Sequence, residues 1–531
     1  MTLLVRESLK PNISTRIHPI YMLYMLTLAT KVRLNVIMCY VCDYFRLALT
    51  ECVGCVTINI LPDDVLLHIF LFNRESCDSY LDGQRDYRTT LSWGWDRLAH
   101  VCQRWRSVVF ASPIALDLKL VCRPWTRVGL TGVWPPLPIV ITNVVDVSLP
   151  QDYDFRAATM HRTRVCELKL VRLTSLLVKR IVSVMQEQFP ALIHLFISVN
   201  RLDSILSRSG PPILPDGFLV GSAPRLQSLR LRCIAFPTLP KLLLSATDLV
   251  HLELWNTPHS GYLSPQAIVT GLAVLANLES FTIGFVSPRS RPIRGSRSPP
   301  PPTRTVVPAL TRFAFKGVSE WLEDLVARIN VPLLNSVFIT LFHQLIFDIP
   351  ELGQFMKRAT RFQELNEVHL DFDHSSIHVG YLPPAQYSEE NTGLKISCRK
   401  FDWQLSSLVQ VFTPFFPSIH LVEDLYIYEH LYLRSEWPED IESTQWLEVF
   451  HPFTSVKNLY LCKEFAPSIS LALKELVGER VTDVLPALRN LFLEELQPSG
   501  SVHEAIGHFV SSRQLIGRPV AVSQWNRARP F

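Results

Sequence analysis

Three groups of residues in the chain have side chains that could bind a metal ion. The first group consists of two cysteine pairs, Cys39/Cys42 and Cys52/Cys55. Four thiolates arranged in two such pairs can hold a tetrahedral zinc ion. However, the gap between the pairs is shorter than usual, and an apolar, helix-like string fills it. We therefore interpret these cysteines as apolar residues of an apolar segment.

The other two groups contain histidines. His503-Glu504 begins a motif similar to HExxH, but the second histidine, His508, comes one position too late to share a helical face with the first. The last group lies where a predicted strand passes into a loop and comprises His369, Asp371, Asp373, His374 and His378. Mixed His/Asp groups can bind metal, but a solvated loop explains these residues equally well.

Local motifs for catalysis are not found in the sequence. The chain has only 20 glycines, and none of them forms a phosphate-binding pattern. No nucleophile elbow, kinase signature set or local Cys/His dyad occurs. We therefore predict no catalytic residue, no cofactor and no bound metal, and we interpret the chain as a binding protein and not an enzyme.

Two short amphipathic helices are predicted near residues 61–70 and 98–106. Pro62 suits the first turn of a helix, and Asp63 and Asp64 place negative charge at the positive end of the helix dipole. Apolar residues recur at helical spacing in both segments. Helices this small bury their apolar stripes poorly, so we expect them to pack against the rest of the chain or a second protein.

These two helices resemble the F-box, the helical module that binds the small adaptor of cullin–RING ubiquitin ligases. The resemblance rests on Leu61-Pro62, on Val65–Phe70 and on the block Val101–Arg106. Residues 112–120 look like the continuation found in F-box-like proteins of mushroom-forming fungi. The resemblance implies an F-box-like module at 57–125.

The sequence departs from the usual F-box in two places. A polar insert at about 73–92 replaces the short link between the helices, and Ala115-Leu116 stands where an aromatic residue is common. The residues implied to bind the adaptor are Leu61, Pro62, Val65, Leu66, Ile69, Phe70, Leu98, Val101, Cys102 and Trp105. An amphipathic helix pair that binds no adaptor remains the alternative.

A second pattern, Leu-x-x-Leu-x-Leu, recurs from about residue 160 onward, for example at Leu226/Leu229/Leu231 and Leu249/Leu252/Leu254. The alternation predicts strands with one buried face, and the stretches between them have helical periodicity. This arrangement resembles an irregular leucine-rich-repeat array, so we predict an α/β fold in which a small helical F-box-like module precedes a leucine-rich-repeat-like solenoid at 126–500. A two-layer α/β domain with a partly open sheet is the alternative.

Two further segments stand out. Residues 287–305 are rich in Pro, Arg and Ser and have almost no apolar content, so we expect a disordered loop there. After the last repeat, residues 501–531 contain one predicted helix, at 502–513, and an Arg-bearing tail. We interpret 501–531 as a C-terminal cap with loose ends.

The binding surface is predicted from strand alternation. Residues between the buried leucines point to the open face of the sheet, and in a solenoid this face is concave. Such positions include Lys169, Glu253, His369 and Glu494. Aromatic residues and arginines often anchor protein interfaces, and those at open-face positions, our candidate target-binding residues, are Arg230, Arg232, Trp255, Tyr426, Tyr428 and Tyr460.

Composition excludes several classes of protein. With 531 residues, 48% of them hydrophobic, and a formal net charge of +4, the chain can form a large core and shows no general affinity for nucleic acid. The apolar run Ile20–Thr30 is shorter than the roughly 20 residues of a spanning helix, so we treat 1–56 as an apolar extension of unknown role and a membrane anchor as unlikely. Scattered single cysteines suit reduced thiols, which favours the cytoplasm or nucleus.

The resemblance and the repeats together predict a substrate-recognition subunit of a cullin–RING ubiquitin ligase. Its partners would be the ligase adaptor and a protein target of unknown identity. The alternative function is a leucine-rich-repeat-like scaffold for protein interactions with no role in ubiquitin transfer.

Overall fold

The computed structural model describes residues 61–78, 95–113, 115–122, 137–143, 160–200, 210–292, 303–358, 366–381, 393–398, 401–429, 443–476, 478–494 and 500–526. The chain divides into two compact units. Unit 1 comprises Met1–Leu120 and Gly132–Leu137, and unit 2 comprises Val121–Thr131 and Pro138–Phe531. The paired cysteines at 39–55, the rest of the 1–56 extension and part of the expected polar insert lie outside the described residues.

Unit 1 contains the helices α3 (Asp63–Asp78), α4 (Trp95–Val101) and α5 (Gln103–Ala111). Two acidic residues stand in the first turn of α3, as predicted. The helix continues to Asp78, so its backbone runs into the segment that we expected to be an insert. A single extended residue, Cys102, separates α4 from α5, and its Sγ accepts the Trp105 N–H at 3.4 Å as an N-cap.

The core of unit 1 is built from α3, α5 and the chain after α5. Its buried members are Leu66, Phe70, Val108, Val109, Leu116, Leu118 and Leu137. The rings of Phe70 and Trp105 lie 4.9 Å apart between centroids and tie α3 to α5. The helix pair therefore has a hydrophobic core of its own.

Unit 2 is organised around one large sheet, whose strands are followed here in their spatial order. The 16-stranded sheet consists of β1 (Leu120–Cys122), β2 (Ile139–Thr142), β3 (Val165–Leu173), β4 (His194–Val199), β5 (Ser228–Arg232), β6 (His251–Thr257), β7 (Ser280–Phe285), β9 (Arg312–Gly317), β11 (Ser336–Phe342), β14 (Gly393–Ser397), β13 (Ser376–Gly380), β12 (Glu367–Asp373), β15 (Asp424–Glu429), β16 (Asn458–Leu461), β17 (Asn490–Leu493) and β18 (Ala521–Gln524). A separate pair joins β8 (Thr305–Val306) to β10 (Ile329–Asn330).

Buried residues alternate with more exposed ones along several strands, including β4, β16 and β17. Leu229 on β5 pairs in register with Leu195 on β4 and Leu252 on β6, and all three side chains are at most 1% exposed. Equivalent leucines and phenylalanines continue this column through the neighbouring strands. Strands that repeat in parallel, each adding to one apolar column, are the hallmark of a solenoid. The predicted α/β solenoid is therefore confirmed.

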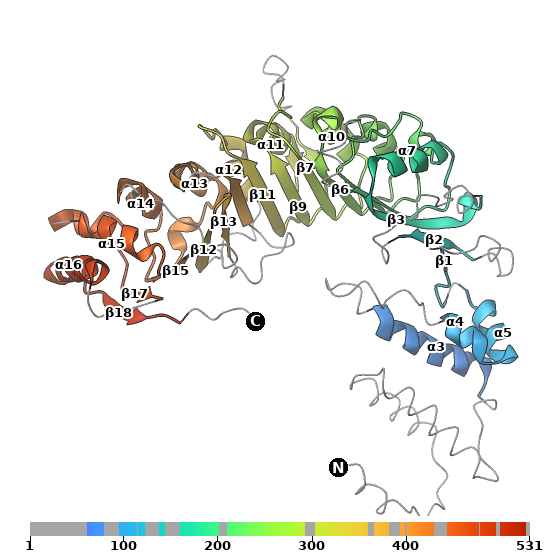
Figure 1. The fold of residues 1–531 in the computed structure, drawn as a ribbon, viewed down its shortest axis with the longest axis horizontal. Helices are drawn as coiled ribbons and strands as arrows, with labels where there is room; N and C mark the ends of the chain where they lie inside the picture. Colours follow the sequence, from blue (N-terminus) through green and yellow to red (C-terminus); the bar gives the residue numbers. More distant parts are fainter. Residues whose placement is uncertain are drawn as a thin grey trace, which may run out of the picture. The chain divides into compact units, whose positions relative to one another are not determined.

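The helices described in unit 2 lie on one face of the sheet, and we call the opposite face, which none of these helices covers, the open face (Figure 1). They are α7 (Ser175–Val184), α9 (Leu239–Leu243), α10 (Pro265–Leu272), α11 (Ser319–Val326), α12 (Pro350–Arg358), α13 (Phe401–Phe415), α14 (Ser443–Phe450), α15 (Ala466–Lys474) and α16 (Ser501–Leu515). No helix in the described part of the chain is both long enough and apolar enough to span a bilayer.

The solenoid is interrupted once by a hairpin. β13 is antiparallel to both β12 and β14, whereas β14 pairs in parallel with β11 and β12 with β15. The three strands therefore enter the sheet in reverse order. The recurring Leu-x-x-Leu-x-Leu pattern of the sequence does not reveal the antiparallel strand β13.

The expected loop at 287–305 is partly ordered. Thr305 pairs with Ile329 in the small sheet, and Arg304 donates to the Ala327 carbonyl at 3.1 Å. At the other end, the Ser287 hydroxyl accepts the Arg289 N–H. Both ends of the segment that we expected to be disordered are thus held by hydrogen bonds, and 293–302 lies outside the described residues.

Candidate functional site

The apolar residues of unit 1 divide into core and surface. Leu66 is 0% and Phe70 2% exposed, so both fill the core of the unit. This corrects their place in the predicted adaptor-binding set, because a side chain inside its own core offers no surface to a partner. Apolar residues at helical spacing share one side of a helix, but the spacing does not show which of them are buried in the core of the unit.

Among the residues of unit 1 whose burial the structure describes, Val101 at the end of α4 is a strongly exposed apolar residue, with 58% of its surface exposed. Pro62, just before α3, is also exposed. The remaining residues of the predicted set are partly buried and comprise Leu61, Val65, Ile69, Leu98, Cys102 and Trp105. These eight residues, which we call the helix face, are the part of the prediction that stays available for contact.

Arg104 fixes the start of α3 against α5. Its guanidinium donates to the Leu61 carbonyl and forms an ion pair of 2.7 Å with Asp63. The pair is partly exposed and contributes little energy by itself, but it orients the Leu61-Pro62 backbone. Arg104 lies within the block Val101–Arg106 that carries the F-box resemblance, but its contact with the start of α3 could not be inferred from the sequence.

The six predicted target-binding residues of unit 2 form two separate groups on the open face of the sheet. Arg230, Arg232 and Trp255 lie on β5 and β6, whereas the three tyrosines lie on β15 and β16. Seven steps between neighbouring strands separate β6 from β15. At about 4.8 Å per step, the groups are roughly 34 Å apart along the sheet.

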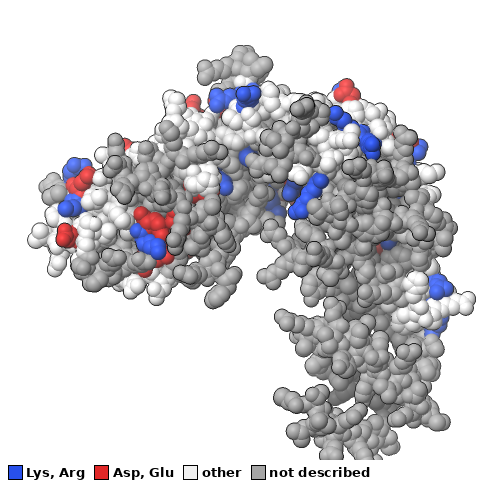
Figure 2. Space-filling model, in the orientation of Figure 1, with Lys and Arg blue, Asp and Glu red and all other residues white. Residues whose placement is uncertain are grey.

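The first group, which we call the charged patch, contains more basic than acidic side chains. Glu253 forms a close ion pair with Arg232 and a longer one, at 4.0 Å, with Arg230. Lys316 from β9 lies over the Trp255 ring at 5.6 Å and donates to the Asn256 side chain. Figure 2 shows Lys and Arg side chains on the hollowed side of unit 2 in this region. Glu253 thus pairs with both arginines, whereas Lys316 contacts a ring and an amide.

The second group is a stack of rings, which we call the aromatic row. It runs from His369 on β12 through Tyr426 and Tyr460 to Phe492 on β17, and each ring stands in register with the next. Successive ring centroids are 4.4, 4.2 and 4.5 Å apart, and the ring planes differ by at most 10°. Burial raises the pKa of Tyr426, and the neighbouring Tyr460 hydroxyl raises it further.

Two predicted open-face residues prove to be buried. Tyr428 is 4% and His369 2% exposed, and the Tyr428 hydroxyl bonds to His369 Nδ1 at 2.5 Å. Burial lowers the pKa of His369 to about 4, so the imidazole is neutral at pH 7. Tyr428 is therefore corrected from a target-contacting residue to one that supports the aromatic row, because neighbouring aromatic side chains cover it.

Metal binding can be assessed for the described residues. The cluster with suitable geometry consists of Cys462, Glu464 and Glu494, and it includes none of the histidines considered in the sequence. Burial raises the pKa of the Cys462 thiol well above its usual value, which favours the neutral thiol over the thiolate that binds metals. Both His503 and His508 are exposed on α16.

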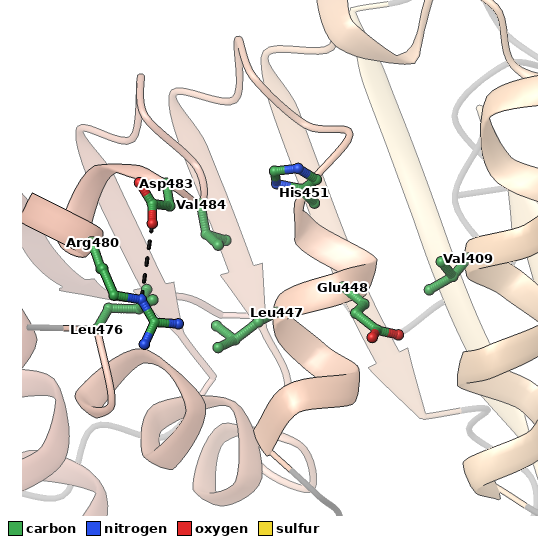
Figure 3. A pocket seen from close by; sticks show the side chains of 8 residues that line it. All are labelled: Val409, Leu447, Glu448, His451, Leu476, Arg480, Asp483 and Val484. Carbon is green, nitrogen blue, oxygen red and sulfur yellow. Dashed lines mark ion pairs between the residues drawn. The ribbon is translucent and has the colours of Figure 1, made fainter.

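A shallow pocket of about 330 Å³ lies on the helix-covered side of unit 2 (Figure 3). Its wall consists of Val409, Leu447, Glu448, His451, Leu476, Arg480, Asp483 and Val484. Arg480 and Asp483 pair with each other at 4.0 Å, while Glu448 points away from them. The polar groups do not converge on a common point, so the pocket has no arrangement for acid–base chemistry.

Similarity to a known protein family is found in the N-terminal part of the chain. Residues 58–114 match the family model described as F-box-like, so the chain carries an F-box-like domain there. The leucine-rich repeat-containing protein LegL7 from Legionella pneumophila is similar in structure, with 13% identity and a TM-score of 0.25 over 65% of this chain and 90% of that one. No curated protein matches the chain.

Proposed function

We propose that the protein is a substrate-recognition subunit of a cullin–RING ubiquitin ligase. The observation that carries the proposal is the F-box-like match at 58–114, followed by a solenoid with an open sheet face. In this proposal the helix face binds the ligase adaptor, and the open face of unit 2 binds a protein target. The boundaries are a 57–125 module, a 126–500 solenoid and a 501–531 cap.

The chain performs no bond chemistry in this mechanism. It holds a target lysine near a ubiquitin-charged enzyme, which raises the effective concentration of the two reactants. A repetitive scaffold suits this task because its stacked repeats present an extended surface to a target. The proposal places the protein in the cytoplasm or nucleus, in a family of F-box-like proteins such as those of mushroom-forming fungi.

The helix face is tested with one charge substitution and a matched control. Val101→Glu places a carboxylate in the most exposed apolar position, where an adaptor contact would have to bury it. Gln103→Glu adds the same charge two residues away, on an exposed position at the start of α5. We expect Val101→Glu to weaken binding to the purified adaptor at least about tenfold, which is about 1.4 kcal/mol.

The control variant should bind the adaptor as the unchanged chain does. Equal affinities of all three chains, or no adaptor binding by any of them, would contradict the proposal. The second outcome would favour a scaffold without ubiquitin transfer. One observation supports that alternative: unit 1 has a core of its own and does not need a partner to bury Leu66 and Phe70.

A further inference from the structure

The aromatic row of unit 2 is already in contact with one more ring, that of Trp525. The Trp525 centroid lies 6.1 Å from Tyr426, 5.7 Å from Tyr428 and 5.5 Å from Tyr460, with the planes tilted by 57°, 41° and 67°. Trp525 directly follows β18, and its backbone N–H donates to the Leu493 carbonyl at 2.7 Å. The C-terminal segment thus carries an indole onto the row from the last strand of the sheet.

The segment that brings this indole is held weakly. β18 is the edge strand of the sheet, and none of its four residues is buried. Val520, just before β18, is buried, and Arg518 donates to the Pro486 carbonyl at 2.9 Å. Segments with few buried contacts and exposed backbone hydrogen bonds open at low free energy. The strand can therefore leave β17 without unfolding the repeats.

The geometry of the row restricts what can bind there. Because His369, Tyr426, Tyr460 and Phe492 stack face to face, their faces cover one another and mainly edges and hydroxyls point outward. A cation needs a ring face, so this row is not a cage for an ammonium group. Ring edges attract the face of another aromatic ring, and the tilted indole of Trp525 uses that arrangement.

We propose that the aromatic row is a docking site for an extended peptide segment with an aromatic side chain, and that residues 521–525 occupy it as an internal ligand. This inference rests on the proposed function in taking the open face as the target-binding surface. A target segment replaces β18 along the edge of β17 and inserts its aromatic ring where Trp525 lies, which is recognition by strand addition. The chain's own tail competes with the target.

The test uses the full chain and an isotope-labelled peptide that copies residues 518–531. Mass spectrometry then separates hydrogen exchange of the chain's own tail from that of the added peptide. We expect saturating peptide to raise exchange at Ala521–Trp525 of the chain about tenfold, because displaced amides lose their hydrogen bonds. The same peptide with alanine in place of Trp525 should not do so.

A second variant tests the inference through the affinity of the peptide and does not depend on hydrogen exchange. Trp525→Ala in the full chain retains the strand but removes the ring, so the tryptophan-bearing peptide should bind this chain about tenfold more tightly than the unchanged chain. Leu515→Ala, at a position 88% exposed on α16, is the matched control and should leave peptide affinity unchanged. The inference would be overturned if the peptides with and without the tryptophan bound equally well, or if the added peptide did not displace residues 521–525 of the chain.

Failure of this inference is distinguishable from failure of the proposed function. The Val101→Glu chain should lose the adaptor and still bind the peptide. Conversely, if the unchanged chain bound the adaptor but not the peptide, the ligase proposal would stand and only the assignment of the aromatic row would fail.

Discussion

Buried His369 makes the C-terminal repeats sensitive to mild acid. Its pKa falls from 6.5 to about 4 because burial disfavours the charged imidazolium. The unfolded chain therefore takes up a proton near pH 6.5, while the folded chain does not. The stability that the neutral histidine contributes is fully present above pH 6.5 and is lost as the pH falls toward 4.

The magnitude follows from the shift. A difference of 2.5 in pKa corresponds to about 3.4 kcal/mol over the whole range, and to about 2 kcal/mol between pH 7 and pH 5. Glu367 on the same strand lies 3.7 Å from His369 Nε2, and its carboxylate would partly offset the cost by attracting the imidazolium. We therefore regard about 2 kcal/mol as an upper value for the step to pH 5.

The assay is guanidinium unfolding of the unchanged chain and of His369→Phe at pH 7 and pH 5, followed by circular dichroism. Phenylalanine keeps a ring beside Tyr426 but does not titrate, so the stability gap between the two chains should move by about 2 kcal/mol in favour of the variant at pH 5. His508→Phe, on an exposed position, should move the gap by less than about 0.5 kcal/mol. If the difference in unfolding free energy between His369→Phe and the unchanged chain were the same at both pH values, the argument from burial of His369 would be refuted.

Two further predictions concern the cores. Phe70→Ala should destabilise unit 1 by about 3–5 kcal/mol, because Phe70 is 2% exposed and touches Trp105, and limited proteolysis should then cleave unit 1 before unit 2. Glu323, whose pKa burial raises to about 7, accepts the backbone N–H groups of Glu351 and Leu352 at the start of α12. Because a raised carboxyl pKa gives stability that is present below pH 4.5 and lost as pH rises through 7, the melting temperature of Glu323→Gln relative to that of the unchanged chain should rise between those two pH values. A difference in melting temperature that is the same at both pH values would contradict that assignment.

The repeat strands were predictable because their signal is local. At β5, Leu229 and Leu231 alternate with Ser228, Arg230 and Arg232, and the buried side of the strand follows from that alternation alone. The hairpin β12–β13 was not predictable, because its turn at His374-Ser375 has neither glycine nor proline. Strand order in a sheet depends on contacts between distant residues, which periodicity does not report.

In the candidate site, too, contacts between residues distant in the sequence could not be predicted. Alternation placed Tyr426 and Tyr460 on the open face, but stacking at 4.2 Å requires the register of two strands that are 34 residues apart. Trp525 lies beyond the last repeat and has no periodic pattern, so its contact with these rings could not be predicted. In unit 1, spacing grouped Phe70 with Val101 because both are apolar, and only packing separated the core residue from the exposed one.

The two groups on the open face of unit 2 differ in what they can contribute to binding a target. In the charged patch Arg232 and Glu253 neutralise each other, and partly exposed ion pairs of this kind are worth at most about 1 kcal/mol. A target must compete with that pair, so the patch favours orientation and rate of encounter over affinity. The aromatic row is different, because stacking fixes the rotamers of Tyr426 and Tyr460 before any ligand arrives. Little side-chain entropy would then be lost on binding, so we expect the aromatic row to contribute more to the affinity for a target than the charged patch does.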